Sequence, residues 1–439
     1  MDNSYVVQDT RNGGYPYISH QFIVVKEPGG GIIYSKEFGR SIAEINDASF
    51  ELLSHCTGNN ILQDIITKYR CTEASTVIDE CISKGVLSFS GFPALKSPVN
   101  IINKREYNPH TVHIELTKKC NLRCVYCYNA SGEPLEDELS TKDFLRVLEI
   151  LKKQGVLAVT FTGGEPFTKK DVMIILEEAL KHFDVSIMTN GQLLGNDEWF
   201  NSLTEHEKSL LKKVIFYQIS LDSLNKEKND AYRGKGTYDN VERAVKRLRN
   251  MGPRITISAT ITQETLKDLP EMEQQLKKWG VKLTMGALEY RGRAKHNNMK
   301  NQIIPIDILN EFSSDEPNIH TEKYVYCNAI RGTFTIRSNG FIKPCTISSE
   351  VFKVFNKNLC ESLHIFELED KELPQTGFFK LLRTLYYFIP SKEECGNCEN
   401  YSSYCKNCGL APHYMKQQGL CKKLGGNINE VAQNRLVNH

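Results

Sequence analysis

The chain has 439 residues, which is long enough for two or three domains with hydrophobic cores of their own. Hydrophobic residues make up 40% and charged residues 25%, as in ordinary globular proteins. A net charge of +2 offers no basic surface to nucleic acid or to an anionic membrane. Because the sequence has no N-terminal apolar signal and no run of about 18 apolar residues, we expect a cytoplasmic protein without a membrane span.

Residues 1–95 predict a small α/β domain. Apolar runs at 22–25 and 32–34 flank three glycines and predict a β-hairpin, helical spacings follow, and 86–90 returns as a strand. This order predicts a winged-helix-like module. The alternatives are a helical cap or dimerisation domain, and a DNA-binding winged helix, which is disfavoured because the candidate recognition helix is not basic. Residues 96–110 predict a linker.

The stretch at 45–70 resembles the leader-recognition domain related to the pyrroloquinoline-quinone chaperone. That family binds the leader of a ribosomally made precursor peptide by adding it as a strand at a sheet edge. The resemblance therefore implies a precursor peptide as partner. Cys56, Cys71 and Cys81 share no ligand spacing, so we expect them to be core thiols.

From residue 111 to about residue 300, strand and helix patterns alternate. Six apolar, β-branched runs occur at 112–116, 158–164, 185–190, 214–222, 255–261 and 282–288. Ser140 and Asp143 predict a capping box for the helix after the first run. Repeated strand–helix units predict a parallel sheet, closed or partly closed, with its active site at the C-terminal strand ends. The near-continuous apolar runs predict strands buried on both faces.

Three cysteines follow the first strand in a C-x3-C-x2-C arrangement, Cys120, Cys124 and Cys127. Soft thiolates favour iron–sulfur clusters or zinc, and three of them leave one iron free for a substrate or cofactor. Tyr126 is placed to cover a planar ligand. The alternatives are cysteines that only fill a core, and a zinc site with a distant fourth ligand. The loop resembles the cluster-binding loop of radical S-adenosylmethionine (radical SAM) enzymes, which implies a catalytic [4Fe–4S] cluster in a partial (β/α)6 barrel at 111–300.

The same resemblance assigns contacts to SAM. Gly163, Gly164 and Glu165 follow a strand and match the segment that binds the methionyl amino group of SAM. Ser220 and Asp222, at the end of the fourth strand, could hold the ribose or the amino-acid part. Arg233 matches the arginine that pairs with the SAM carboxylate, and Asn190 is a further polar candidate. The alternative for each of these is a solvated loop or a cap residue.

Eight further cysteines fall between residue 327 and residue 421. They resemble the SPASM domain, which holds two auxiliary [4Fe–4S] clusters, and this places the domain at 301–439. The resemblance assigns Cys327, Cys345 and Cys408 to the first cluster, and Cys395, Cys398, Cys405 and Cys421 to the second. Whether Cys360 completes the first cluster is left open. The spacings x2, x6 and x2 depart from the family's x2, x5 and x3, and the alternative is a zinc site, although x6 is short for a zinc ribbon.

This combination of domains resembles the makers of sactipeptides and ranthipeptides, which join a Cys sulfur to a carbon atom. It implies a maturase that needs SAM, three [4Fe–4S] clusters, a precursor peptide and an external one-electron reductant. A 5′-deoxyadenosyl radical would abstract hydrogen from an unactivated carbon. The alternatives are a streptide-type cyclase that forms a carbon–carbon bond, formylglycine-type maturation, and an iron–sulfur scaffold without turnover. No general base can be named, and His113 is expected to be a core residue.

Overall fold

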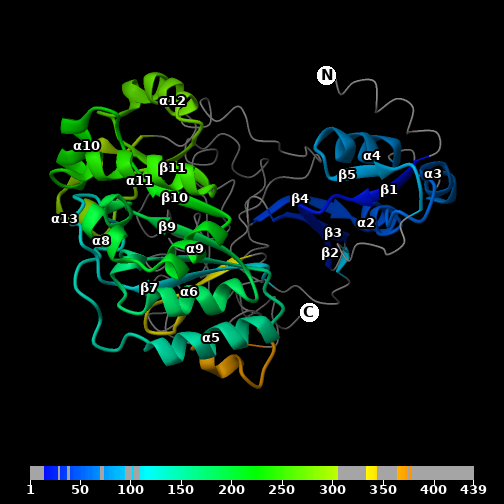
Figure 1. The fold of residues 1–439 in the computed structure, drawn as a ribbon, viewed down its shortest axis with the longest axis horizontal. Coiled ribbons are helices and arrows are strands. Elements are labelled where there is room, and N and C mark those ends of the chain that lie inside the picture. Colours follow the sequence, from blue (N-terminus) through cyan, green and yellow to red (C-terminus); the bar gives the residue numbers. More distant parts are fainter. Residues whose placement is uncertain are drawn as a thin grey trace, which may run out of the picture. The chain divides into compact units, whose positions relative to one another are not determined.

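The computed structural model describes most of the first 304 residues and a few segments after them. These residues are 14–27, 30–36, 40–69, 74–93, 101–102, 109–304, 333–343, 363–373 and 376. They fall into two compact units, one that contains the described residues up to Ile102 and one that begins at Pro109 (Figure 1).

The N-terminal unit has two small sheets and three helices. Its elements are β1 (Tyr15–Ile18), β2 (Phe22–Glu27), β3 (Gly30–Ser35), β4 (Arg40–Asn46), α2 (Asp47–Ser54), α3 (Leu62–Tyr69), α4 (Ala74–Ser83), β5 (Leu87–Ser90) and β6 (Ile101–Ile102). One sheet has the order β4-β3-β2-β6, and the other pairs β1 with β5. The predicted hairpin is confirmed, because β2 and β3 are antiparallel with Val24 opposite Ile33. The winged-helix assignment stays a prediction.

The core of this unit contains two of the three predicted core thiols. Cys56 is 0% exposed and Cys81 is 2% exposed, and both pack with Phe50 and Leu53 of α2. Burial raises the pKa of Cys81 to about 12, as expected for a thiol without chemistry of its own. Cys71 lies outside the described residues. Part of the predicted linker is a strand, because β6 pairs in parallel with β2.

The second unit is built on an eight-stranded sheet. The strands are β7 (Thr111–Thr117), β8 (Ala158–Gly163), β9 (Asp184–Thr189), β10 (Phe216–Ser220), β11 (Arg254–Ile261), β12 (Lys282–Ala287), β13 (Thr333–Ile336) and β14 (Ile342–Lys343), in the order β12-β11-β10-β9-β8-β7-β13-β14. All six predicted strands are present and parallel, in chain order from β7 to β12. β13 adds to β7 in parallel, and β14 is antiparallel to β13.

Helices connect these strands. They are α5 (Thr141–Lys153), α6 (Val172–Leu180), α7 (Gln192–Gly195), α8 (Asp197–Ser202), α9 (Glu205–Lys213), α10 (Lys226–Arg233), α11 (Thr237–Met251), α12 (Leu269–Lys278) and α13 (Arg293–His296), with short 3-10 turns at Pro166–Thr168, Leu266–Asp268, Met299–Gln302 and Ile365–Leu368. The predicted capping box is confirmed: Ser140 accepts from the backbone of Asp143, and the Asp143 carboxylate accepts from the backbone of Ser140. Ser140 thereby satisfies a helix N–H group that has no partner inside α5.

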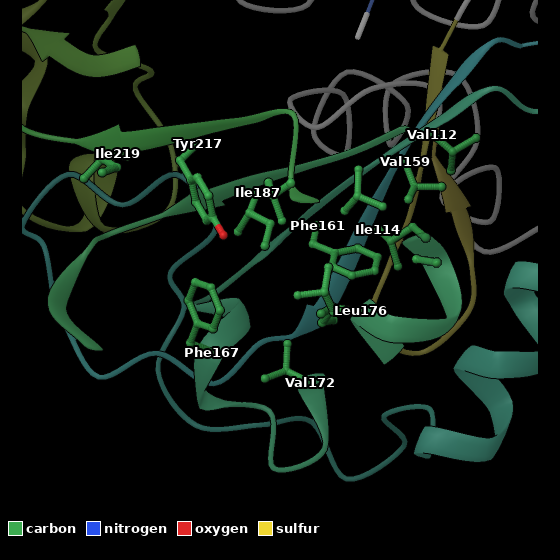
Figure 2. Packing of buried hydrophobic residues seen from close by; sticks show 14 of the residues in the cluster. Val112, Ile114, Val159, Phe161, Phe167, Val172, Leu176, Ile187, Tyr217 and Ile219 are labelled. Atoms are coloured by element: carbon green, nitrogen blue, oxygen red, sulfur yellow. The ribbon is translucent and has the colours of Figure 1, made fainter. Parts of the chain in front are cut away.

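The hydrophobic core lies between the sheet and the helices on one of its faces. Val112, Phe161, Ile187 and Ile219 of four neighbouring strands are 0% exposed. Figure 2 shows these side chains along the sheet, with Phe161 next to Leu176 of α6. Burying each large apolar side chain stabilises the fold by roughly 1.5–3 kcal/mol.

The prediction that the strands are buried on both faces is wrong for β10, β11 and β12. In β10 and β11 buried residues alternate with partly exposed ones, and in β12 partly exposed residues alternate with exposed ones. The partly exposed face carries polar side chains that pair across the strands, such as Gln218 opposite Thr256 and Ser220 opposite Ser258. Because the core helices cover only the apolar face, the sheet keeps a polar face that ends where the predicted site residues lie.

Candidate active site

The cysteine loop follows β7 directly and is held by its own backbone. The Cys120 amide donates to Gly132 O at 2.8 Å, and the Cys127 amide donates to Cys124 O at 3.2 Å. All three cysteines are free thiols of intermediate exposure. Burial raises the pKa of the Cys120 thiol to about 11 and also raises the pKa of Cys124. Metal ligation would lower these thiol pKa values again, because a coordinated thiol is deprotonated.

The spacing of the three sulfur atoms tests the zinc alternative. Two sulfurs bound to one zinc ion lie roughly 3.8 Å apart, given tetrahedral Zn–S bonds of about 2.3 Å. In the described part of the chain, one group of possible ligands has atoms that all lie within 4.8 Å of one another, and it consists of Glu149, Glu178 and His182 rather than the cysteines. The cysteines therefore fit a cluster of several irons better than a single ion. Cys120, Cys124 and Cys127 would hold such a cluster.

The start of α13 and Gly292 before it hold the cysteine loop in place, and no local pattern in the sequence predicted this contact. Arg293 donates through Nε to Cys124 O at 2.7 Å and through Nη1 to Ser131 O at 2.8 Å. Its backbone amide donates to Cys127 O at 3.0 Å. The preceding Gly292 has φ +54°, and a Cβ atom there would lie 2.3 Å from Cys127 O. Only glycine lets these two loops approach so closely.

Gly163 and Gly164 bring the end of β8 against the other side of the cysteine loop. A Cβ atom on Gly164 would lie 2.1 Å from Lys119 O, and one on Gly163 would lie 2.4 Å from Thr117 O. The Gly164 amide donates to Thr117 O at 2.7 Å, and the next amide donates to Lys119 O at 2.8 Å. The two glycines therefore serve close packing between the loops, which places their backbone beside the cysteines.

The Glu165 carboxylate is 0% exposed and points to the end of β9. It accepts from Asn190 N at 2.7 Å, Thr189 Oγ1 at 2.8 Å and Phe167 N at 3.2 Å. Burial raises the pKa of Glu165 to about 7, against the lowering effect of these donors. In this structure the carboxylate connects the ends of β8 and β9, and its predicted contact with SAM stays a prediction.

Asn190 links this strand end to the first cysteine. Its Nδ2 atom donates to Asn121 Oδ1 at 2.8 Å and lies 3.8 Å from Cys120 Sγ. The Leu122 amide also points at Cys120 Sγ, at 3.4 Å. N–H groups directed at a ligand sulfur are among the features that tune a bound cluster. Asn190 therefore lies beside the sulfur of Cys120, and its predicted contact with SAM stays a prediction.

Asp222 lies at the centre of a buried network. It is 1% exposed and accepts from Arg233 Nε and Nη2 at 2.8 Å each, from Thr260 N at 2.9 Å and from the Tyr126 hydroxyl. Burial alone would lower the pKa of Arg233, but Asp222 raises it above its ordinary value, so the guanidinium stays charged. The predicted contact of Asp222 with the cofactor stays a prediction, and in this structure the carboxylate orients Arg233 and Tyr126.

Arg233 and Tyr126 both contact this carboxylate and lie next to each other. The Arg233 guanidinium carbon lies 5.6 Å from the centre of the Tyr126 ring. Arg233 Nη1 has no hydrogen bond to the described residues, so it is left for an incoming acceptor. Ser220 ends β10 on the polar face of the sheet and is only partly buried. The structure therefore brings the predicted residues together at the C-terminal strand ends.

A second buried ion pair lies on the polar face of the sheet. Glu115 of β7 accepts from Lys343 of β14, and their side chains are 6% and 4% exposed. Beside them the Nδ1 atom of His113 is enclosed and has no partner among the described residues. Burial lowers the pKa of His113 to about 4, and Lys343 adds to this effect. The sequence analysis missed this pair, because 228 residues separate its partners.

The auxiliary cysteines lie outside the described residues. They are Cys327, Cys345, Cys360, Cys395, Cys398, Cys405, Cys408 and Cys421. Their assignment to two clusters, and the SPASM domain with it, stays a prediction. Among the described helices, none combines the length and apolar character needed to cross a membrane.

Comparisons with known proteins find similarity in the region that contains this site. Residues 114–276 match the model of the Radical SAM superfamily. The antilisterial bacteriocin subtilosin biosynthesis protein AlbA of Bacillus subtilis (strain 168) is 24% identical over 458 residues, which cover 93% of this chain and 95% of AlbA. The mycofactocin maturase MftC of Mycolicibacterium smegmatis is 33% identical over 181 residues, which cover 41% of this chain and 44% of MftC.

Solved structures extend the likeness to nearly the whole chain. Streptococcus suis SuiB bound to the precursor peptide SuiA superimposes with a TM-score of 0.57 at 19% identity, over 92% of this chain and 97% of SuiB. SuiB bound to S-adenosylmethionine gives a TM-score of 0.53 at 16% identity, over 91% and 96%. At these identities the likeness concerns the fold.

Proposed function

This chain carries a radical SAM domain, and we propose that it uses the domain to cross-link a ribosomally synthesised precursor peptide. The observation that carries the proposal is the convergence of the three-cysteine loop, the two packing glycines and Arg233 at the C-terminal ends of the parallel strands. The similarity to AlbA over 93% of the chain, with its role in subtilosin biosynthesis, supports a peptide substrate.

A [4Fe–4S] cluster and SAM, when bound, supply a 5′-deoxyadenosyl radical that abstracts hydrogen from carbon. The residues of this chain would bind the cluster and SAM and orient them toward the substrate. Cys120, Cys124 and Cys127 would hold the cluster, and Nη1 of Arg233, which has no hydrogen bond within the described residues, is suited to a carboxylate. Tyr126, fixed by its hydroxyl to Asp222, offers a ring for a planar group.

The bond that we propose is a thioether between a Cys sulfur and a carbon atom, following the resemblance of the domain combination. A carbon–carbon bond between two side chains is the alternative. The two reactions need the same site, because each begins with abstraction of one hydrogen atom and then releases one electron and one proton. The electron would go to an auxiliary iron–sulfur cluster.

Co-expression with the short reading frames beside the gene tests this function. We expect one peptide to lose two hydrogen atoms, as seen by mass spectrometry, and to lose one alkylatable thiol if a thioether forms. An unchanged thiol count together with the same mass loss would favour the carbon–carbon bond. A protein that releases no 5′-deoxyadenosine after reduction with SAM would instead be a scaffold without turnover.

We further propose that the N-terminal unit binds the leader of this peptide at the edge strand β4. Within the described residues β4 pairs only with β3, whereas β2 has partners on both sides. An unpaired strand edge can accept a peptide as an additional strand through backbone hydrogen bonds.

Hydrogen–deuterium exchange of the full-length protein checks the leader site. On addition of the leader, we expect slower exchange at amides of Arg40–Asn46 and little change in Phe22–Glu27, which is already paired on both sides. Protection that appears only in the second unit would contradict the assignment.

A further inference from the structure

The loop after β12 holds one arginine in an unusual environment. Arg291 donates its backbone amide to Glu289 O at 2.8 Å and accepts from Ala294 N at 3.1 Å. The next residue, Gly292, packs on Cys127 O, so the backbone of Arg291 is fixed beside the third cysteine of the cluster loop. Its position is therefore set by the same contacts that hold the cysteine loop.

Within the part of the chain that the structure describes, two guanidinium nitrogens of Arg291 are buried without a hydrogen-bond acceptor. The residue is 9% exposed, and both Nε and Nη2 are enclosed and unpartnered. The nearest carboxylate, that of Glu289, lies 3.7 Å from Nε, which is too far for a hydrogen bond. The ring of Tyr128 lies 5.7 Å from the guanidinium carbon. Buried donors without an acceptor are costly, and native structures nearly always pair them.

We propose that Arg291 binds a carboxylate at the C-terminal end of β12. A guanidinium offers two parallel N–H groups that match the two oxygens of a carboxylate. Glu289 nearby makes the site less favourable for a doubly charged group such as phosphate. The carboxylate would come either from SAM or from an acidic group of the precursor peptide, and this choice of sources rests on the proposed function.

The test uses the full-length protein with its clusters reconstituted anaerobically. The variants are Arg291→Gln, Glu289→Gln and, as a matched control, Arg247→Gln, whose guanidinium pairs with Asp197 on the helical side of the domain. The first readout compares the dissociation constants of SAM and decarboxylated SAM. The second measures, in the SAM-loaded protein, how much glutarate raises the melting temperature relative to neutral glutaramide.

If SAM is the source, Arg291→Gln weakens SAM binding about tenfold or more and leaves decarboxylated SAM unaffected. If the peptide is the source, SAM binding stays within about twofold, and the stabilisation by glutarate disappears. In both cases Arg247→Gln changes neither readout, and Glu289→Gln leaves carboxylate binding intact or tighter, because it removes a competing anion.

Two results would overturn the site. One is that neither readout depends on Arg291. The other is that Glu289→Gln reproduces the losses of Arg291→Gln, which would make Glu289 the true partner of the guanidinium. Since neither readout requires cross-linking, a failure of this site is distinguishable from a failure of the proposed maturase function.

Discussion

A variant with alanine at Cys120, Cys124 and Cys127 is expected to release no 5′-deoxyadenosine from SAM under reducing conditions. Without three thiolates on this loop no cluster with an open iron can form there, and the electron needed for SAM cleavage has no route. The iron content should fall from about twelve to about eight per chain, if the other cysteines hold two auxiliary clusters. Anaerobic iron and sulfide analysis, with chromatography of the nucleoside product, measures both.

The control for this variant is Cys81→Ala. Cys81 is 2% exposed in the core of the N-terminal unit and is not a predicted ligand. Its replacement should leave iron content and SAM cleavage unchanged. If the wild-type protein contained four irons and zinc, the assignment of two auxiliary clusters would be wrong, and so would the electron path that they provide. Continued SAM cleavage by the triple variant would contradict the assignment of the loop itself.

The strands of the second unit could be predicted because their apolar, β-branched runs are long and lie between clear helix signals. The helix after β7 could be placed from Ser140 and Asp143, whose side chains act within three residues of each other. The strands β1 and β4 were missed, because they are short or mixed in composition and are stabilised by partners elsewhere in the chain. Tertiary pairing of this kind leaves little local signal.

The site shows the same division between local and long-range information. The spacing of the three cysteines lies within eight residues and identified the loop directly. The partners of Glu165 and Asp222 could not be predicted, because they come from other strand ends and helices. The donors that reach a buried carboxylate are therefore set by the fold and not by the neighbouring sequence. The same holds for Arg293, whose acceptors lie 169 and 162 residues away.

Asp222→Asn is expected to lower the free energy of unfolding of the second unit by about 3–5 kcal/mol, the usual cost of removing one partner from a buried ion pair. Asp222 and Arg233 are 1% and 8% exposed, so the remaining guanidinium charge would be left without a counter-ion. Tyr126 would also lose the charge of its acceptor. Because Arg233 and Tyr126 both face the proposed SAM site, we expect SAM to bind at least tenfold more weakly. Denaturant unfolding and equilibrium binding of SAM measure the two effects.

Three further variants separate charge burial from cofactor positioning. Asp268→Asn removes the ion-pair partner of Lys228, which lies on α10 together with Arg233. The side chains of Asp268 and Lys228 are 23% and 35% exposed, so the free energy of unfolding should fall by less than about 1 kcal/mol. Tyr126→Phe removes one hydrogen bond and should cost about 1 kcal/mol. In the double variant Asp222→Asn with Arg233→Gln, stability should recover relative to Asp222→Asn, because no uncompensated charge remains. SAM affinity should not recover with it. If the double variant regained both, Asp222 and Arg233 would act only in folding, and the role of Arg233 toward the SAM carboxylate would be wrong.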